Sequence, residues 1–221
     1  MKRPEEFCIP VLGLVGCSAS GKSTLCAELP AAAVIAADDF YKPRDACPFV
    51  DLAAEVQWPS GELPTAFRAR GGADLNHPDS VDWAACADAV DAAVEKIVDS
   101  GGGGVVVVEG LLLLGAGAER VRDRCAQLVL LDDGYDDPAK QEVLWRRKWT
   151  RSGHLGKQSY KERGVTADEY AAYWGDYVSA RWKEYGLDRV EAAGRPIHRV
   201  DAHADDRSAQ VEHILRALEP S

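Results

Sequence analysis

The stretch GCSASGKST, residues 16–24, follows the short apolar run VLGLV and opens the helical pattern KSTLCAEL. Its spacing is G-x-x-x-x-G-K-[ST], with Gly16, Gly21, Lys22 and Ser23 at the defined positions. Glycines at these positions let backbone N–H groups turn toward phosphate oxygens at the start of a helix. Lys22 adds a positive charge beside the outer phosphates, and the Ser23 hydroxyl can bind Mg²⁺. We therefore predict a phosphate-binding loop.

Short apolar runs and helical patterns alternate along the rest of the chain. This alternation predicts a parallel sheet with helices on both faces and ligands at the carboxyl ends of the strands. We expect one α/β domain over 1–221, a three-layer α/β/α fold with a five-stranded parallel sheet and a helical lid. The expected strands are 10–16, 33–37, 105–110, 127–132 and 196–202, and the expected helices are 22–29, 82–98, 136–153, 166–186 and 205–219.

The segment from residue 38 to about 81 has a different character. Five prolines and three glycines break any periodic pattern there. A stretch of this length without regular structure is typical of a functional loop or a mobile one. We assign residues 42–80 as a substrate-binding loop.

Composition excludes several classes of function. The chain of 221 residues carries a formal charge of −10, from 36 acidic and 26 basic residues, which argues against a nucleic-acid-binding surface. The longest apolar runs are far shorter than the roughly 20 residues of a membrane span, and the amino-terminal residues lack a secretion signal pattern. The six cysteines form no C-x-x-C pair. We expect a cytoplasmic protein with free thiols and no membrane or nucleic-acid partner.

Acidic residues follow two of the expected strands. Asp38 and Asp39 end the second strand, in ADDFYKP, and Glu109 ends VVVVEG. A carboxylate at this sheet edge can accept a proton from an attacking hydroxyl, and we assign that role to Asp38. In the alternative interpretation the two aspartates only cap a loop. Glu109 can hold Mg²⁺ directly or through water.

Basic residues concentrate in WRRKWTRSGHLGK, residues 145–157. On a helix, Arg147 and Arg151 share a face, four residues apart. Such a cluster can neutralise the charge of a transferring phosphoryl group, and a solvated basic face is the alternative. We place the lid at about 146–165.

Together, GCSASGKST, ADDFYKP, NHPDSVDW, VVVVEG and RRKWTR resemble the uridine kinase and phosphoribulokinase-like superfamily, and most closely its nicotinamide riboside kinase branch. The resemblance runs from about Val11 to Arg181. It implies that Asp38 is the catalytic base, with Lys22 as the second catalytic residue, and that Ser23 and Glu109 bind magnesium. The ATP-binding residues that it implies are Gly16, Ser18, Ala19, Ser20, Gly21, Lys22, Ser23, Thr24, Arg147 and Arg151.

The resemblance also implies substrate contacts, at Asp38, Tyr41, Asn76, Tyr177 and Arg181. The last two belong to a W-x-x-Y-x-x-x-R pattern that begins at Trp174, for which we expect core packing. Two departures from the family pattern bear on the acceptor. Asn76 stands where uridine kinases have an acid that holds ribose hydroxyls, so a charge-assisted hydrogen bond is lost. The base-reading hairpin of uridine kinases is replaced by a glycine turn before VVVVEG.

The sequence therefore predicts an ATP- and Mg²⁺-dependent kinase that phosphorylates a hydroxyl of a small, nucleoside-like molecule. Nicotinamide riboside is the first candidate acceptor, and uridine, cytidine or a non-nucleoside alcohol such as a sugar acid or vitamin precursor are alternatives. A nucleotide-dependent switch is disfavoured because the guanine-reading N-K-x-D motif is absent. A non-catalytic nucleotide-binding module is the third interpretation. The oligomeric state is left open.

Overall fold

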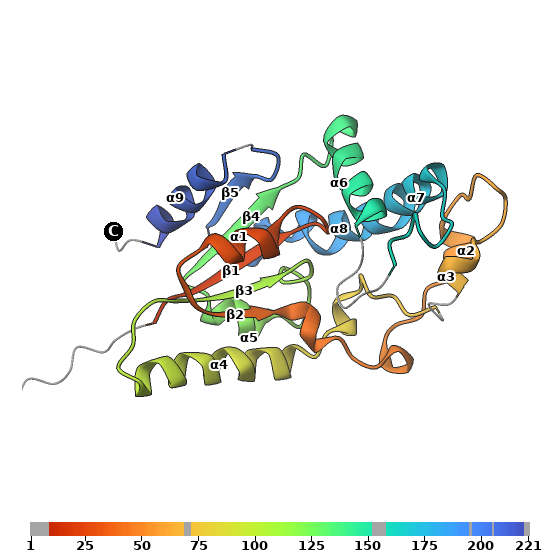
Figure 1. Ribbon diagram of the computed structural model, residues 1–221. Coiled ribbons are helices and arrows are strands. Elements are labelled where there is room, and N and C mark those ends of the chain that lie inside the picture. The colour runs from red at the N-terminus through yellow and green to blue at the C-terminus, as the bar shows by residue number, and fades with distance from the viewer. Residues whose placement is uncertain (1–8, 69–71, 152–157, 195, 205, 219–221) are drawn as a thin grey trace, which may run out of the picture.

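Five parallel strands form the centre of the fold (Figure 1). The computed structural model describes residues 9–68, 72–151, 158–194, 196–204 and 206–218. The strands lie in the order β2-β3-β1-β4-β5, and every neighbouring pair is parallel, as the sequence predicts. Their bounds are β1 Val11–Gly16, β2 Ala31–Ala36, β3 Val105–Gly110, β4 Gln127–Asp132 and β5 Ile197–Asp201.

The central strands β1 and β3 are buried along their whole length. Because successive side chains of a strand point to opposite faces, each apolar run contributes to two hydrophobic clusters. Leu12 and Leu14 of β1 belong to one cluster, and Val11 and Val15 belong to the other. Burial of each such side chain stabilises the fold by about 1.5–3 kcal/mol, so the middle of the sheet is the most strongly fixed part of the molecule.

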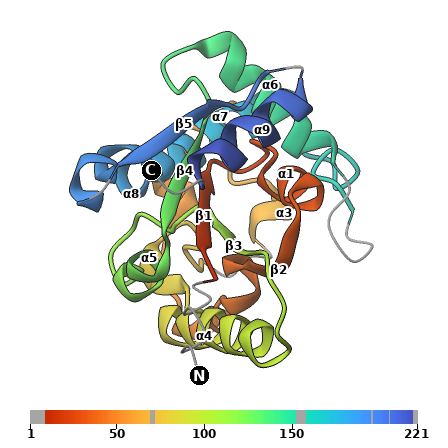
Figure 2. The same ribbon diagram turned by 90° about the vertical axis from the view of Figure 1, so that its left-hand side faces the viewer.

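Helices cover both faces of the sheet (Figure 2). On one face lie α1, Lys22–Glu28, and α9, Arg207–Ala217. On the other lie α4, Trp83–Asp99, and α5, Glu119–Arg124. The short helix α5 is missing from the sequence prediction. None of the described helices is both long and apolar enough to span a membrane.

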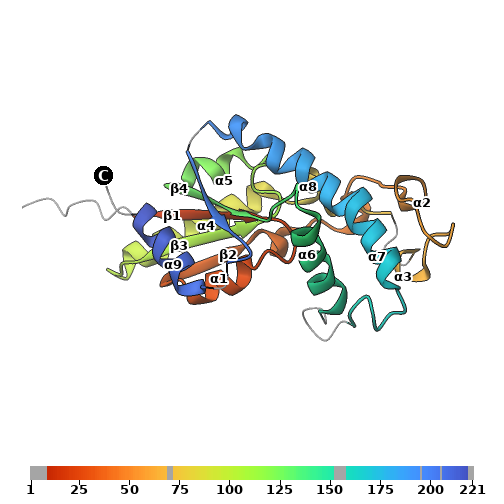
Figure 3. The ribbon, with the colours of Figure 1, turned by 90° about the horizontal axis from the view of Figure 1, so that it is seen from above.

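A second group of helices lies beyond the carboxyl ends of the strands. It comprises α6, Pro138–Thr150, and α7, Ala167–Tyr173, which continues through a π-helical segment, Trp174–Ser179, into α8, Ala180–Tyr185 (Figure 3). The sequence predicts one helix over 166–186. The structure differs in that a π-helical segment, 174–179, interrupts the α-helical backbone. Asp137 begins α6 and Thr166 begins α7, because their side chains accept hydrogen bonds from backbone N–H groups of the first turn.

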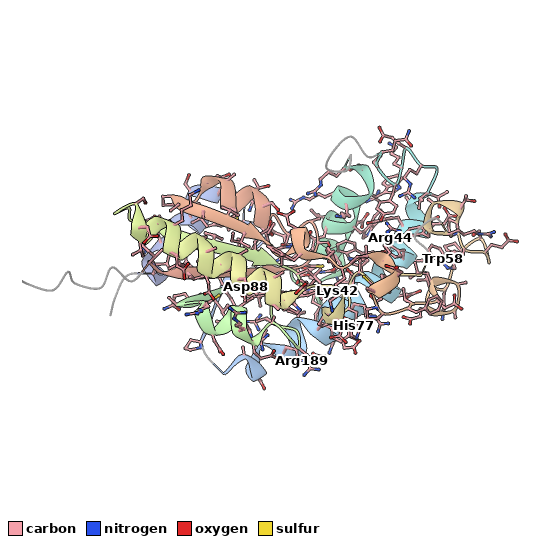
Figure 4. The ribbon with its side chains drawn as sticks, turned by 90° about the horizontal axis from the view of Figure 1, so that it is seen from below. Lys42, Arg44, Trp58, His77, Asp88 and Arg189 are labelled. Atoms are coloured by element: carbon pink, nitrogen blue, oxygen red, sulfur yellow. The ribbon has the colours of Figure 1, made fainter. Side chains whose placement is uncertain are left out.

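The segment that follows β2 reaches out to this second helix group. The sequence predicts no regular structure there, whereas the structure has five short helices: 37–40, 44–46, α2 Leu52–Glu55, α3 Thr65–Arg68 and 78–80. Figure 4 shows Lys42, Arg44 and Trp58 on this outward part of the chain, away from Asp88 on α4. Aromatic packing holds the segment in place, because the Phe67 ring lies 4.5 Å from that of Tyr173 between ring centroids.

A buried carboxylate ties the same segment to α8. Asp74 is 2% exposed, and its Oδ1 accepts a hydrogen bond from the Tyr177 hydroxyl at 2.6 Å. Its Oδ2 lies 3.2 Å from Nε of Arg181, and its backbone carbonyl accepts a hydrogen bond from the Ser80 hydroxyl. A buried charge needs such partners, so these contacts fix the segment against the helices.

The Tyr177 hydroxyl provides a test of this contact. Tyr177→Phe leaves a lone pair of the buried Asp74 carboxylate without its donor, so we expect the free energy of unfolding to fall by about 1–3 kcal/mol. Urea denaturation followed by circular dichroism measures the change. Tyr135→Phe serves as the control, because the Tyr135 hydroxyl makes no hydrogen bond to any described residue. Equal stability of the two variants would show that Asp74 does not depend on Tyr177.

Candidate functional site

The backbone between β1 and α1 adopts the conformation that a phosphate-binding loop requires. Ala19 has φ of 64° and Gly21 has φ of 98°, so two residues of the turn lie in the left-handed region. Left-handed backbone is costly for alanine, and such strain persists where the surrounding structure imposes it. Left-handed residues within a turn bring successive N–H groups to one side, which makes a concave site for an anion.

Lys22 lies over this loop. Its Nζ donates hydrogen bonds to the carbonyl oxygens of Gly16 at 2.9 Å and Cys17 at 3.1 Å. The ammonium group is thereby held next to the N–H groups of the turn, where it can move onto the outer phosphates of a nucleotide.

Ser23 and Glu109 meet at the carboxyl ends of β1 and β3. The Ser23 hydroxyl donates a hydrogen bond of 2.6 Å to Oε1 of Glu109, and the register places Leu14 opposite Glu109. Mg²⁺ prefers oxygen ligands and is usually held by one or two protein groups together with substrate phosphates and waters. The pair fits that donor set. No group of three or more His, Cys, Asp or Glu side chains that could hold a metal occurs among the described residues.

A small pocket, which we call the phosphate pocket, opens over the loop. It contains most of the residues that the sequence assigns to ATP and magnesium. Gly16 and Ser20 lie beneath it and do not line it. Ser20 is fully buried, and its Oγ lies 2.7 Å from the position that a Cβ at Gly16 would take, so glycine is needed there for packing. The lining residues are Ser18, Ala19, Gly21, Lys22, Ser23, Thr24, Asp38, Glu109, Lys148 and Arg151.

A second pocket of about 170 Å³, the aromatic pocket, adjoins the first. Aromatic rings from α7 and its surroundings line it, and the 42–80 segment contributes Leu75 and Asn76. A space of this volume is of the size of a small molecule or of part of one. The lining residues are Ser18, Asp38, Tyr41, Leu75, Asn76, Lys148, Tyr160, Tyr170, Tyr173, Trp174 and Val178.

Ser18, Asp38 and Lys148 line both pockets. Asp38 stands on the turn that follows β2, and it brings a carboxylate to the junction of the two spaces. Asp39, its neighbour, lines neither of them. Of these two adjacent acids, the one that lines both pockets is Asp38, the residue to which the sequence assigns the proton-accepting role.

The basic cluster on α6 is arranged differently from the sequence prediction. Lys148 and Arg151 line the phosphate pocket, whereas the Arg147 side chain is exposed and lines neither pocket. The helix rotation decides this, because Lys148 lies four residues after the buried Leu144 and so shares its inward face. That spacing could have identified Lys148 from the sequence. Of the expected lid, residues 152–157 lie outside the described chain.

The residues assigned to the acceptor divide into two groups. Tyr41 and Asn76 line the aromatic pocket, whereas Tyr177 and Arg181 contact Asp74 and do not line it. The sequence gives no role to Asp74, although it is an acid two residues before Asn76 in the family-like stretch.

Tyr41 is held rigidly at the edge of the aromatic pocket. Its hydroxyl donates a hydrogen bond of 2.8 Å to the carbonyl oxygen of Leu75. Burial, together with the negative charge of Asp38, raises the pKa of the Tyr41 hydroxyl, so it stays protonated and acts as a donor.

A hydrogen-bonded chain connects the aromatic pocket to the end of β4. Trp174 lines the pocket, and its Nε1 donates to Oε1 of Gln141 on α6 at 3.0 Å. Nε2 of Gln141 in turn donates to Oδ2 of Asp133 at 3.3 Å. Asp133 is fully buried, and burial raises the pKa of its carboxyl above the ordinary value. This chain fixes the base of α6, the helix that carries Lys148.

The chain was compared with protein-family models, with curated protein sequences and with solved structures, and only solved structures match it. No protein-family model matches the chain, and no curated protein sequence matches it. The solved structure of a candidate fructose transport system kinase from Silicibacter sp. TM1040 superimposes with a TM-score of 0.51 and 17% identity, over 89% of this chain and 91% of that chain. A sugar kinase from Janibacter sp. HTCC2649 covers 94% of this chain and 93% of that chain, at 18% identity and a TM-score of 0.44. The first likeness supports the α/β fold.

The buried carboxyl of Asp133 generates a prediction about pH. Its pKa is raised in the folded state, so the folded protein binds this proton more tightly than the unfolded chain, and ionisation at neutral pH opposes folding. Asp133→Asn removes that charge. We expect the variant to have a higher Tm than the parent at pH 7, and the difference to shrink as the pH falls toward 4.

Differential scanning calorimetry between pH 4 and pH 7 measures this effect. Asp123→Asn is the matched control, because Asp123 is exposed and its replacement changes the net charge equally. A Tm difference for Asp133→Asn that is independent of pH would show that the carboxyl does not titrate differently in the folded state.

Proposed function

We propose that this protein is an ATP- and Mg²⁺-dependent small-molecule kinase. The observation that carries the proposal is the position of Asp38, whose carboxylate lies where the phosphate pocket and the aromatic pocket meet. In phosphoryl transfer to an alcohol, the phosphate donor and the acceptor hydroxyl must meet beside a group that can accept the hydroxyl proton. The two adjoining pockets supply that arrangement.

On the donor side, the loop N–H groups and Lys22 bind the β- and γ-phosphates. Ser23 and Glu109, which share a hydrogen bond, are the residues that would hold Mg²⁺. When bound, the metal neutralises negative charge that develops on the phosphate oxygens. Lys148 and Arg151 add positive charge from α6 and its C-cap, and Lys148 also lines the aromatic pocket on the acceptor side.

On the acceptor side, an alcohol oxygen attacks the γ-phosphorus while the bond from that phosphorus to the bridging oxygen of ADP breaks. The hydroxyl proton passes to Asp38, so the products are a phosphate monoester and ADP. Asp38 also holds the hydroxyl in place before transfer. Positioning of this kind is the main contribution that a protein makes to phosphoryl transfer.

The aromatic pocket suits a small ring that carries hydroxyl groups. Tyrosine and tryptophan rings offer apolar faces, and Asn76 and Tyr41 offer polar groups at the edge. The resemblance of the sequence motifs makes nicotinamide riboside the first candidate acceptor, and uridine and cytidine follow. The fold likeness to the fructose transport system kinase makes a sugar hydroxyl the leading non-nucleoside alternative.

A panel of alcohols tests the proposal. Nicotinamide riboside, uridine, cytidine and fructose are each incubated with the protein, ATP and Mg²⁺, and ADP release is compared with phosphate ester formation. We expect one acceptor to give equal amounts of ester and ADP. ATP binding without any transfer in a broad panel would favour the non-catalytic module instead.

Asp38 and Asp39 form a matched pair for the catalytic role. Asp38→Asn keeps the side-chain volume and removes the proton acceptor, so transfer is expected to fall by at least about 10², with ATP affinity little changed. Asp39→Asn is expected to stay close to the parent. Steady-state rates and calorimetric ATP titrations measure both effects. If Asp39→Asn lost transfer and Asp38→Asn did not, the catalytic base would be Asp39 and the assignment to Asp38 would be wrong.

Variants of Lys148 and Arg147 test which basic residue of α6 acts in transfer. Lys148 lines both pockets in the structure, whereas Arg147 is the residue that the sequence assigns to ATP. Lys148→Ala removes a positive charge at the junction of the two pockets, so kcat is expected to fall by about 10². Arg147→Ala is expected to change kcat by less than about threefold, because its side chain lies outside both pockets. A larger loss in Arg147→Ala than in Lys148→Ala would mean that α6 rotates when ATP binds.

A further inference from the structure

Arg207, the first residue of α9, lies against the phosphate-binding loop. Its Nη2 is 2.8 Å, and its Nη1 3.1 Å, from the position that a Cβ at Gly21 would occupy. Figure 1 shows α9 next to α1, the helix that this loop begins. A side chain at residue 21 would displace the guanidinium, so the glycine creates the space in which Arg207 sits.

Buried groups hold the guanidinium in this position. Its Nη1 donates a hydrogen bond of 2.9 Å to Oε1 of Gln210. Gln210 is 3% exposed, and its Nε2 donates to the backbone carbonyl of Asp201 at the end of β5. Arg207 is thus connected to the sheet through a buried side chain, which restricts its rotamers before any ligand binds.

Arg207 also differs from most arginines of this acidic chain. Within the described residues it has no carboxylate partner, and its one side-chain hydrogen bond goes to a neutral amide. Arg207 is half-buried, so part of its side chain remains accessible to another group. The described arginines that do pair with carboxylates are Arg68, Arg120, Arg122, Arg124, Arg146, Arg181, Arg199 and Arg216.

The strand order determines which part of a nucleotide can reach Arg207. Asp38 follows β2 and Glu109 ends β3, so the γ-phosphate lies on the β2–β3 side of the loop. Arg207 follows β5, on the opposite side of β1 and β4. A triphosphate that points its terminal group toward Asp38 therefore directs its nucleoside toward the β5 side.

We propose that Arg207 binds the base of the nucleotide, by stacking its guanidinium plane on the purine ring. The proposal rests on the proposed function, because it requires ATP in the loop. A guanidinium stacks on aromatic faces and adds a cation–π attraction. Arg207 is thus a residue for nucleotide affinity, and it is not among the residues that line the phosphate pocket.

The test compares two ligands that differ only in the nucleoside. Calorimetry measures binding of ATP and of inorganic triphosphate, each with Mg²⁺, to the parent, Arg207→Gln and Arg207→Lys. We expect ATP to bind about tenfold more weakly to both variants, because stacking needs the planar group, and triphosphate binding to stay unchanged. Arg216→Gln is the control on the same helix, where Arg216 pairs with the exposed Glu212.

Other outcomes overturn the inference. Equal weakening of ATP and triphosphate, or full recovery in Arg207→Lys, would mean that the charge acts on the phosphates. Unchanged ATP binding in Arg207→Gln would mean that the base lies elsewhere. In each of these cases the parent still binds ATP, so the proposed function stands. A parent that binds neither ligand rejects the proposed function, and this inference with it. Thermal melting of each variant checks that it is folded.

Discussion

Burial of β1 between β3 and β4 is the constraint on which the rest of the structure depends. Its register brings Leu14 opposite Glu109 and Gly16 opposite Leu131, so three strand ends lie at one edge. The turn that follows β1 has little freedom, because Gly16 packs closely on Ser20 and Leu131. The strained backbone of Ala19 is the local cost of this arrangement, and the buried strands supply the stability that offsets it.

Charge distribution explains how an acidic protein can hold a polyanion. The formal charge of −10 repels phosphate at long range, but salt screens that repulsion beyond roughly 8–10 Å. At short range the loop N–H groups, Lys22, Lys148 and Arg151 face the same small space. Two acids, Asp38 and Glu109, line that space as well, and the proposed function uses them separately, as proton acceptor and as magnesium ligand. Local positive charge therefore decides whether an anion can bind there.

The sequence predicted the parallel sheet, the loop conformation and the residues around Lys22, because these depend on local patterns and on the order of the elements. It did not predict the rotation of α6, which depends on packing of Leu144 and on the hydrogen bond between Gln141 and Trp174. Arg207 was missed for a similar reason. Its neighbour Gly21 is 186 residues away in the chain, and only the sheet order brings the two together. Asp74 was missed because nothing in its local sequence marks it as buried.

The contacts of Lys22 and Ser23 give the most direct test of the account. A crystal structure with Mg²⁺ and a non-hydrolysable ATP analogue should show Nζ of Lys22 on phosphate oxygens in place of the Gly16 and Cys17 carbonyls. It should also show the metal beside Ser23 and Glu109, and the terminal phosphate facing Asp38. An analogue bound elsewhere, with Lys22 still on those carbonyls and Ser23 still hydrogen-bonded to Glu109, would contradict the assignment of this loop as the donor site.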